Sequence, residues 1–444
     1  MTLALQWEDS GSRSETLQEH SELTSCKKKE NRQQVTIIGA GIVGVATAVH
    51  LQRAGYDVTI VDKEPPGEGV SLGNAGIIAC CSVVPVPTPG IWKKAPGMLL
   101  DPMGPLSLKW SYLPSLLPWL MAYLRNSSAE RVEVIASGLH SLLSDALREH
   151  QALAHGTKAE QLIKPSPWMY LYRNEAAYHK DAFAWDLRRR HGAKISHLKH
   201  GEVQDMEPAI SPNYTFAAVM QDHAFVRDPL RLVQLYAEEF VRIGGKILQR
   251  EVVDVEIGDN GPKRVYTAEG QIEVQRLVIA AGAWSSKLAA RLSSPVPLEA
   301  ERGYHVVLTN SGVNTKHPIM SATGKFIATP MAMGLRLAGL IEFAGLEAPP
   351  NYKRARTLLK HAQNLFPGVQ TEEYTEWMGR RPALPDSLPV IGRSPHFENV
   401  YYAFGHQHVG LTGGPKTGRL IAEIIQNKPP SIDMAPFSIN RFAT

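Results

Sequence analysis

The first clear hydrophobic pattern of the chain predicts a strand, a helix and a second strand in succession. Residues 35–38 form an apolar run of the kind found in buried parallel strands, and the run ends at Gly39. Apolar residues then recur at helical spacing over residues 43–53, and Gly55 follows where a helix end favours a left-handed residue. Residues 56–61 are again strand-like. This order predicts a βαβ unit and a parallel sheet.

Further strands and helices are spread over the rest of the chain. Helical spacing is typical of residues 129–150, 175–190, 229–243 and 353–365, and of a last helix that ends at Ile425. Strand-like runs occupy residues 168–172, 215–220, 251–255, 276–281 and 400–404. Three more runs, 303–308, 335–343 and 373–378, predict an antiparallel sheet. We therefore expect an α/β protein with a second, mixed domain.

Length and composition agree with a folded protein of two or three domains. The chain has 444 residues, of which 43% are hydrophobic and 20% charged. These values exclude collagen-like, coiled-coil and largely disordered chains. Lys and Arg number 47 and Asp and Glu 43, so the formal net charge is +4. A net charge this small for the length does not indicate the basic surface that binds the phosphate backbone of nucleic acids, so we expect no nucleic acid partner.

The N-terminus and the cysteines bear on the compartment. Residues 1–33 contain no apolar run long enough for a secretory signal and predict a disordered leader. The three cysteines, Cys26, Cys80 and Cys81, cannot form a disulfide framework. The vicinal pair Cys80 and Cys81 suits redox chemistry, although small buried residues are the commoner explanation. We therefore expect a reducing compartment and a cytoplasmic protein, which leaves room for association with the inner face of the membrane.

The most apolar stretch, residues 112–124, is too short to span a bilayer and contains Pro114 and Pro118. Two interpretations remain open. The stretch is either an interfacial patch through which the protein meets a membrane, or an ordinary packed helix layer. The two prolines favour the packed layer, because they interrupt the continuous face that an interfacial helix presents. At most peripheral contact with a membrane is expected.

A glycine-rich motif follows the first predicted strand and opens the first predicted helix. It reads Gly39-Ala40-Gly41-Ile42-Val43-Gly44. Gly39 permits the tight turn, Gly41 lets the backbone approach a pyrophosphate, and Gly44 allows the helix to pack closely on the strand. Asp62 ends the second strand, where a carboxylate accepts hydrogen bonds from a ribose and repels a 2′-phosphate. The motif predicts a dinucleotide site that disfavours NADP, and by itself it does not separate FAD from NAD.

Five segments in order resemble one known family. They are residues 39–44, 71–76, 278–285, 379–392 and 405–418, and the second reads Ser71-Leu72-Gly73-Asn74-Ala75-Gly76. The resemblance is to the FAD-dependent D-amino acid oxidase family, nearest to its D-amino acid dehydrogenase and glycine oxidase branch. It covers residues 34 to about 442.

The resemblance implies a Rossmann-type FAD-binding domain built from discontinuous segments and a substrate-binding domain with an antiparallel sheet. The boundaries it suggests are 34–80, 195–290 and 380–444 for the FAD-binding domain, and 81–194 and 291–379 for the substrate-binding domain. The cofactor-binding residues carried over are Gly39, Gly41, Ile42, Val43, Gly44, Asp62, Lys63, Ser71, Asn74, Ala75, Gly76, Val253, Ala281, Gly282, Trp284, Gly405, His406, Gly410, Leu411 and Thr412. In the last of these segments, loop backbone amides are better candidates than the imidazoles.

The family's activity implies oxidation of the CH–NH bond of a small amino acid. The expected substrate is a D-amino acid, including cyclic ones such as D-proline or hydroxy-D-proline, with hydride passing to flavin N5 and the imine hydrolysing afterwards. A quinone or another acceptor would take the electrons. Two alternatives stay open: an oxidase that uses O2, and a non-catalytic flavin-holding subunit that only transfers electrons. Nothing in the chain indicates the oligomeric state.

Three residues are candidates for the substrate site. Arg381 matches the family arginine that pairs with the substrate carboxylate, with Arg380 as its rival and a structural salt bridge as the alternative. Tyr304 falls on the strand where relatives place a tyrosine over the carboxylate, although a core tyrosine is almost as good an explanation. His408 occupies a position where a glycine oxidase carries an arginine, which leaves its role open. No histidine spacing indicates a metal site.

Overall fold

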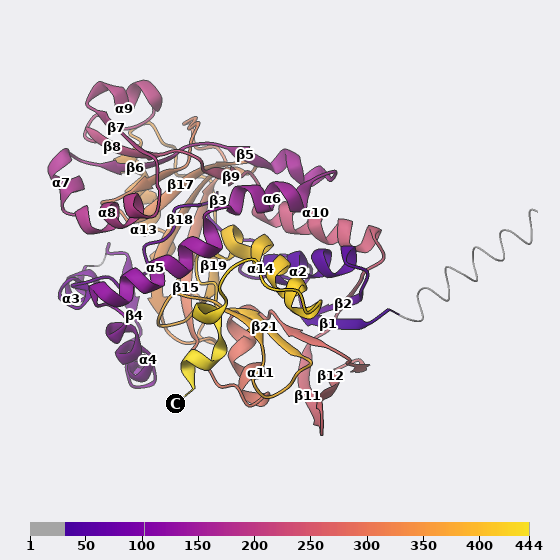
Figure 1. The fold of residues 1–444 in the computed structure, drawn as a ribbon. Helices are drawn as coiled ribbons and strands as arrows, with labels where there is room; N and C mark the ends of the chain where they lie inside the picture. Colours follow the sequence, from indigo (N-terminus) through magenta and orange to yellow (C-terminus); the bar gives the residue numbers. More distant parts are fainter. Residues whose placement is uncertain (1–31, 102, 444) are drawn as a thin grey trace, which may run out of the picture.

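The computed structural model describes residues 32–101 and 103–443, so residues 1–31 of the expected leader, with Cys26, lie outside the described part. The first large sheet has six strands in the order β10-β2-β1-β14-β21-β20, and only β20 runs antiparallel to its neighbour (Figure 1). Its strands are β1 (Gln34–Ile38), β2 (Asp57–Asp62), β10 (Lys246–Gln249), β14 (Leu277–Ile279), β20 (Val390–Arg393) and β21 (Val400–Phe404). Four separate parts of the chain thus form one parallel sheet, as the sequence predicted.

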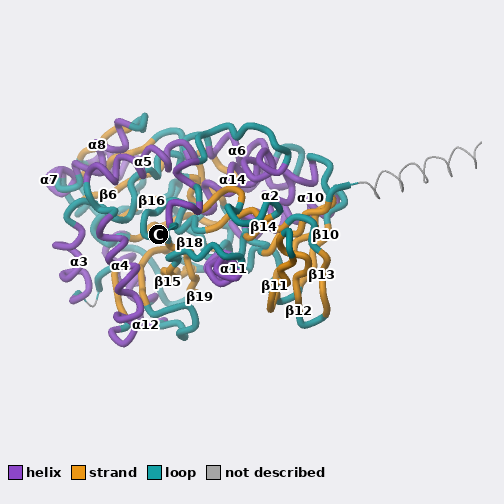
Figure 2. The backbone as a smooth tube through the Cα atoms, turned by 60° about the horizontal axis from the view of Figure 1, so that its bottom comes forward, coloured by secondary structure: helices purple, strands orange, loops and turns teal. Residues whose placement is uncertain are grey.

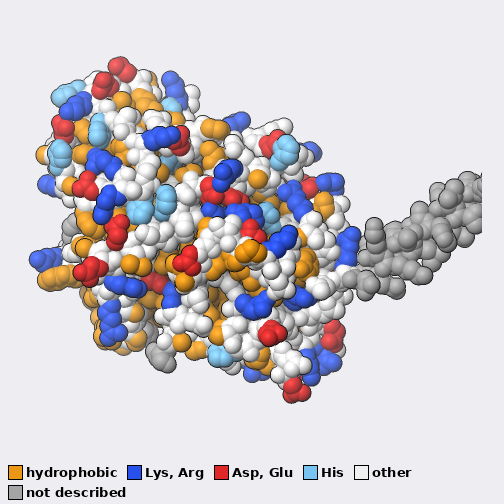
Figure 3. All heavy atoms as spheres, viewed as in Figure 1, with side chains coloured by type: hydrophobic (Ala, Val, Ile, Leu, Met, Phe, Trp, Pro, Cys, Tyr) orange, Lys and Arg blue, Asp and Glu red, His pale blue; other side chains and the backbone are white. Residues whose placement is uncertain are grey.

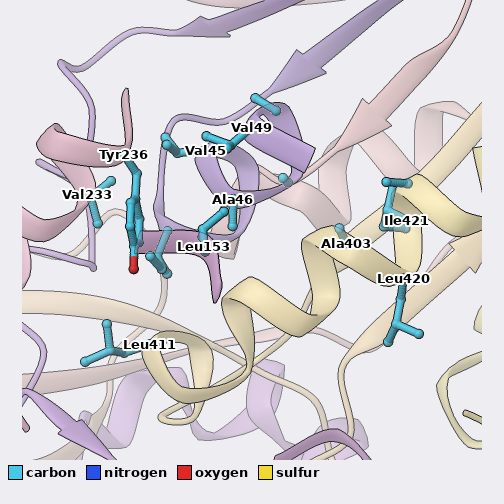
Figure 4. Packing of buried hydrophobic residues seen from close by; sticks show 14 of the residues in the cluster. Val45, Ala46, Val49, Leu153, Val233, Tyr236, Ala403, Leu411, Leu420 and Ile421 are labelled. Atoms are coloured by element: carbon cyan, nitrogen blue, oxygen red, sulfur yellow. The ribbon is translucent and has the colours of Figure 1, made fainter. Parts of the chain in front are cut away.

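Helices from segments that are far apart in the sequence pack on this sheet. They are α2 (Ile42–Arg53), α5 (Ala129–Leu143), α6 (Ala146–Ala154), α10 (Pro229–Arg242) and α14 (Gly410–Ile425). Figure 4 shows how their apolar side chains meet: Val45 and Val49 of α2 lie near Leu153 of α6 and Tyr236 of α10. Because α14 returns from the C-terminal end to lie along α2, it closes the layer over the glycine motif.

Glycines of the motif permit close packing at the start of α2. Gly39 has φ +117°, and a Cβ there would lie 2.2 Å from the carbonyl oxygen of Ala280. A Cβ on Gly44 would lie 1.9 Å from the Gly39 carbonyl oxygen, so only glycine allows this approach of helix to strand. Gly41 differs from both, because a Cβ there meets only the Ser71 hydroxyl oxygen, at 3.5 Å. The first and third glycines therefore serve packing, and the second opens onto free space.

The second large sheet has nine strands and is mostly antiparallel. Its order is β19-β15-β18-β17-β16-β6-β8-β7, and β4 pairs with β18. The strands are β4 (Leu106–Leu108), β6 (Trp168–Tyr172), β7 (Ile195–Lys199), β8 (Phe216–Met220), β15 (Glu299–Leu308), β16 (Ile319–Ser321), β17 (Phe326–Met331), β18 (Gly334–Phe343) and β19 (Tyr374–Ala383). This sheet confirms the expected antiparallel layer beside the parallel one.

The register of β15 on β19 separates two faces at this end of the sheet. Glu301 pairs with Arg381, and Arg302 pairs with Arg380. Because side chains alternate along a strand, Glu301 and Arg381 share one face, while Arg302 and Tyr304 share the other. We call the first the inner face, since it contacts residues 72–75, and the second the outer face, since it packs on α12 (Tyr352–Ala355) and α13 (Thr357–Leu365).

Smaller elements complete the fold. Two three-stranded sheets consist of β3 (Ile77–Ile78), β9 (Ala224–Val226) and β5 (Ile163–Pro165), and of β11 (Val252–Gly258), β12 (Gly261–Thr267) and β13 (Gly270–Glu273), the latter projecting at one end in Figure 2. The other α-helices are α3 (Ile91–Leu100), α4 (Leu113–Arg125), α7 (Glu175–His179), α8 (Ala182–Arg190), α9 (Gly201–Met206) and α11 (Ser285–Arg291). Short 3-10 helices span Trp110–Tyr112, Lys158–Leu162, Gly282–Trp284, Ala435–Phe437 and Ile439–Phe442.

The structure differs from the expected domain boundaries at two places. Strands β7 and β8 fall in the 195–290 segment assigned to the FAD-binding domain, but they pair in the nine-stranded sheet. Helices α5 and α6 fall in the 81–194 segment assigned to the substrate-binding domain, but their apolar residues join the core around α2 and α14. Amphipathic helices and strands do not encode which layer they join, so the local patterns could not place these segments.

Helix α4 settles how the apolar stretch 112–124 folds. It is a continuous helix across Pro118, and Pro114 lies in its first turn. Leu116, Trp119 and Tyr123 are buried, whereas Leu117, Met121 and Leu124 are exposed on the other side. The helix therefore has one packed face and one exposed apolar face. Among the described residues, no helix combines the length and the apolar character needed to cross a membrane.

Candidate active site

A long cleft of about 780 Å³ starts at the glycine motif and reaches the edge of the second sheet. Its lining comes from the Gly39 turn, the end of β2, residues 250–253, residues 280–288, β19 and residues 403–410. These segments lie at the carboxyl ends of the parallel strands, where open α/β sheets bind their ligands. The volume lies within the usual range for ligand sites.

Hydrogen bonds around the glycine motif fix its position at one end of the cleft. The Asp62 carboxylate accepts from the Ala40 amide at 2.6 Å, and the Ser71 hydroxyl accepts from the Ile42 amide at 3.1 Å. Asp62 and Ser71 both line the cleft. The Asp62 carboxylate thus lies at the end of β2, in the place expected for a ribose partner.

Cationic side chains and an indole border the cleft further along. The Lys63 ammonium lies 4.9 Å from the centre of the Trp284 ring, and the Arg380 guanidinium lies 5.8 Å from it. Val253, from β11, is 64% exposed and lines the same space. Arg380 also donates to the Leu346 carbonyl oxygen. The rival arginine of the sequence analysis therefore lines the cleft and donates one hydrogen bond, through Nε, to the backbone.

Most of the expected cofactor-binding residues line the cleft, and six do not. The lining ones are Gly39, Gly41, Ile42, Val43, Asp62, Lys63, Ser71, Val253, Ala281, Gly282, Trp284, Gly405, His406 and Gly410. The other six are Gly44, Asn74, Ala75, Gly76, Leu411 and Thr412, and contacts with protein account for their positions. The Asn74 side chain, for example, accepts from the Gly76 amide, and the Thr412 hydroxyl joins residues 77 and 79.

Residues 72–75 tie the nucleotide end of the molecule to the inner face. Arg336 donates to the carbonyl oxygens of Leu72 and Asn74, at 2.9 and 2.7 Å. The ring of His305 lies 3.2 Å from the Gly73 carbonyl oxygen through Nδ1. Burial lowers the pKa of His305 to about 3, and the charge of Arg336 adds to the effect. The neutral imidazole therefore donates from Nδ1 to the carbonyl.

A buried polar cluster occupies the inner face, formed by Glu301, Arg381 and Gln407. Arg381 Nη1 lies 2.7 Å from Glu301 Oε1 and 3.1 Å from the Leu340 carbonyl oxygen. Gln407 Nε2 donates to Glu301 Oε2 at 2.9 Å. Gly303 leaves room for the guanidinium, since a Cβ there would lie 2.1 Å from Arg381 Nη2. Arg381 is thus ion-paired, the alternative that the sequence left open, and its side chain keeps 20% of its exposure.

Two further side chains respond to the charges of this cluster. His408 has an exposed side chain, yet desolvation lowers its pKa, while the charge of Glu301 opposes that effect. Burial raises the pKa of Tyr123 on α4, and the negative charge of Glu301 raises it further. His408 therefore lies within reach of the charges of Glu301 and Arg381, and its role at the substrate site stays a prediction.

The structure does not bring Tyr304 to Arg381. Its hydroxyl donates to Glu342 and accepts from the Asn351 amide on the outer face. Burial, followed by Glu342, raises the pKa of Tyr304 to about 12. The strand alternation explains the separation, because Tyr304 is three residues from Glu301 and so points to the opposite side. The core-tyrosine interpretation fits this position.

The loop before α14 presents backbone to the cleft. His406 Nε2 lies 2.9 Å from the Thr417 hydroxyl, and burial lowers the pKa of His406 to about 3. The neutral imidazole is engaged through Nε2, and the loop amides of Gln407 and Val409 donate to the carbonyl oxygens of Pro382 and His406. Sequence reasoning missed Glu301 and Gln407, although a glutamate within an apolar strand just before Arg302-Gly303-Tyr304 was a usable signal.

Comparison with known proteins places this geometry in a family. The family model described as DAO, FAD dependent oxidoreductase, matches residues 34–424. The chain belongs to this family. The match includes the glycine motif, both sheets and α14, so the oxidoreductase uses FAD. The residues fit that cofactor, since the cleft joins the open position at Gly41 and the Asp62 carboxylate to the second sheet.

Curated relatives cover nearly the whole oxidoreductase. A D-amino-acid oxidase of Bradyrhizobium diazoefficiens is 40% identical over 92% of this chain and 99% of that protein. A D-amino acid dehydrogenase of Paramagnetospirillum magneticum is 30% identical over 93% of this chain and 99% of that protein. The solved structure of glycine oxidase from Geobacillus kaustophilus shares the fold, with a TM-score of 0.68 at 22% identity, covering 93% of this chain and all 100% of that one.

The described residues indicate neither a metal site nor a reactive cysteine pair. No group of three or more His, Cys, Asp or Glu side chains is arranged to hold a metal ion there. Burial raises the pKa of both Cys80 and Cys81, which favours the thiol over the reactive thiolate.

Proposed function

We propose that the oxidoreductase removes two electrons from the CH–NH bond of a small D-amino acid. The observation that carries the proposal is Arg381, held on the inner face where that face meets residues 72–75 and 405–408. The names of the relatives that are 40% and 30% identical support the substrate class. Small and cyclic D-amino acids, such as D-proline, follow from the family resemblance.

In this proposal Arg381 orients the substrate. Its planar guanidinium offers a two-point contact to a carboxylate, which fixes the direction of the Cα–H bond as well as the position of the charge. Gly303 provides the space, and the Glu301 carboxylate holds the guanidinium in one orientation. His408 would border the same substrate in its neutral form. When bound, FAD supplies the hydride acceptor, and the imine product hydrolyses in water.

Anaerobic reduction of the yellow enzyme tests the substrate class. We expect D-proline or D-alanine to bleach the flavin band, and the L-enantiomers, glycine and sarcosine to bleach it more slowly. Loss of the flavin band with none of these compounds at millimolar concentration would contradict the proposal. Faster bleaching by the L-enantiomers would move the enzyme to another substrate class.

We propose a quinone or a similar acceptor for the electrons, with O2 as the second candidate. The name of the 40% identical relative favours O2, and the names of the more distant dehydrogenases favour another acceptor. Turnover with a quinone analogue should exceed turnover in air. Stoichiometric peroxide, formed at the rate of the dye assay, would make the protein an oxidase.

We also propose peripheral contact with the inner face of the cytoplasmic membrane. Exposed apolar side chains lie on α3, on α4 and on the 3-10 helix that precedes α4, including Trp92, Trp110, Leu117 and Met121 (Figure 3). Residues 85–126 carry four basic residues and a single acidic one, Asp101. Apolar groups among basic ones suit an anionic lipid surface. The enzyme should float with anionic vesicles, and Trp110→Ser with Leu117→Ser should not; failure of the wild type to float would contradict the contact.

A further inference from the structure

Among the described residues of the inner face, Arg336 and Gln407 each have a buried polar atom without a hydrogen-bond partner, and of these two Gln407 lines the cofactor cleft. It is 6% exposed and lies on the cleft wall. Its Nε2 donates to Glu301, whereas its Oε1 is buried with no hydrogen-bond partner. The orientation of the amide follows from chemistry, because a carboxylate only accepts and so must face the NH2 group. A buried acceptor without a donor costs free energy, so a missing donor is implied.

The backbone holds Gln407 in this position. Its φ is +47°, a left-handed conformation that a residue with a side chain rarely adopts. Its amide donates to the Pro382 carbonyl oxygen on β19 at 3.1 Å. Strain of this kind persists where the surrounding structure fixes a side chain for a purpose. The backbone of Gln407 is therefore fixed beside β19, the strand that carries Arg381.

Glu301 itself has capacity left for a donor. It is 3% exposed, and each carboxylate oxygen has one partner, Arg381 or Gln407. A carboxylate accepts up to about four hydrogen bonds. Arg381 also has capacity, since its Nη2 makes only a long contact of 3.5 Å with the Gly339 carbonyl oxygen. The cluster thus offers acceptors from Glu301 and Gln407 and donors from Arg381.

We propose that Gln407 Oε1 and the Glu301 carboxylate bind the amino group of the substrate while Arg381 binds its carboxylate. This assignment rests on the proposed function and makes Glu301 and Gln407 specificity-determining residues. A zwitterionic amino acid has no net charge, and neither has the Glu301–Arg381 pair, so binding buries no unbalanced charge. A 2-hydroxy acid or a plain carboxylate brings an uncompensated negative charge next to Glu301, and the site therefore selects amino acids.

Two compounds that lack a Cα–H bond test this assignment, because neither can be oxidised. They are 2-aminoisobutyrate and 2-hydroxyisobutyrate, which differ in the amino group alone. Their dissociation constants are measured by perturbation of the flavin spectrum and by inhibition of turnover. We expect the wild type to prefer the amino compound by about tenfold or more, because buried polar groups of the site lose their partner in the hydroxy compound.

Variants separate recognition from support of Arg381. Glu301→Gln removes the charge at constant shape, and Gln407→Met removes the amide oxygen at similar size. Each should lower the preference for the amino compound about fivefold or more, chiefly by weakening its binding. The matched control is Glu342→Gln, which changes the buried Arg302–Glu342 pair of the outer face and should leave the preference unchanged.

Each outcome decides. A wild type without preference overturns the assignment and leaves a bound water as the partner of Gln407 Oε1. Equal losses for both compounds in Glu301→Gln and Gln407→Met also overturn it, since Glu301 then only supports Arg381. In either case, bleaching of the wild type by D-amino acids would keep the proposed function intact. A wild type that no amino acid reduces overturns both.

Discussion

Each face of the sheet at β15 carries an arginine paired with a buried glutamate, Arg302 with Glu342 of β18 and Arg381 with Glu301, but the two pairs differ in their surroundings. On the outer face, Arg302 Nε lies 3.3 Å from Glu342, which also accepts from Tyr304, and Arg302 donates to the Pro349 carbonyl oxygen at 2.6 Å. On the inner face, Arg381 and Glu301 adjoin Gln407, whose amide oxygen has no partner.

The cavities next to the two pairs differ as well. The outer pair borders a cavity of about 320 Å³ that shares no lining residue with the nucleotide cleft. The inner pair adjoins Gln407 and Pro382, which do line that cleft. A buried ion pair is therefore no sign of function by itself. Its position relative to the cofactor cleft is the informative feature, since Arg302 Nε of the outer pair is also buried without a hydrogen-bond partner.

The largest expected effect breaks the inner pair. Arg381→Ala should lower kcat/KM by about two to four decades, because it leaves the carboxylate of the substrate buried without a partner, which costs about 3 to 5 kcal/mol. Arg381→Lys keeps the charge but loses the two-point contact of the guanidinium, so its kcat/KM should lie between those of wild type and Arg381→Ala. All variants should retain FAD, and Arg380→Ala is the matched control with a far smaller loss. The measurement is steady-state kinetics on the best substrate. If kcat/KM of Arg381→Ala lies within about fivefold of wild type, a difference near 1 kcal/mol, another residue binds the substrate carboxylate.

A smaller effect should follow from moving Arg381 without removing it. Gly303→Ala puts a methyl group into the space of the guanidinium, whose far end can shift. A misplacement of about 1 Å costs about a hundredfold in rate, so we expect a loss of about ten- to a hundredfold in kcat/KM with the melting temperature nearly unchanged. A Gly303→Ala enzyme with wild-type kinetics would show that the position of Arg381 is unimportant.

The outer face should respond in stability and not in activity. Tyr304→Phe leaves Glu342 short of one donor and the Asn351 amide without its acceptor, which should lower the free energy of unfolding by about 1 to 3 kcal/mol. We expect kcat/KM of the folded variant to stay within about threefold of wild type. Urea denaturation and kinetics measure the two quantities. A large loss of kcat/KM at unchanged stability would return Tyr304 to the substrate site.

How far sequence reasoning reached depends on whether a feature is local. The βαβ unit with Gly39, Gly41 and Asp62 could be predicted because its signals lie within 30 residues of chain. The pairing of Glu301 with Arg381 could not, because strand register joins residues 80 positions apart. Tyr304 was grouped with Arg381 from the family resemblance, and strand alternation places the two on opposite faces. The role of Gln407 depends on a left-handed backbone that no pattern of residue types reveals.

The smallest expected effect is a difference in acid sensitivity. His305 on the inner face has a pKa lowered to about 3, below its unfolded value of 6.5. The unfolded chain therefore binds a proton first, and stability is full above pH 6.5 and falls as the pH drops toward 3. The loss for His305 is about 1.4 kcal/mol per pH unit in that range. His305→Asn should reduce the difference between urea midpoints at pH 7.5 and 5.0, and an unchanged difference would contradict this.

The most direct measurement is a crystal structure of the enzyme with FAD and 2-aminoisobutyrate. We expect the carboxylate of 2-aminoisobutyrate within about 3.2 Å of the Arg381 guanidinium, and its amino nitrogen within the same distance of Gln407 Oε1 or Glu301. A ligand whose carboxylate lies on Arg380, or which occupies the cavity beside Arg302 and Glu342, would contradict the assignment of the inner face as the substrate site.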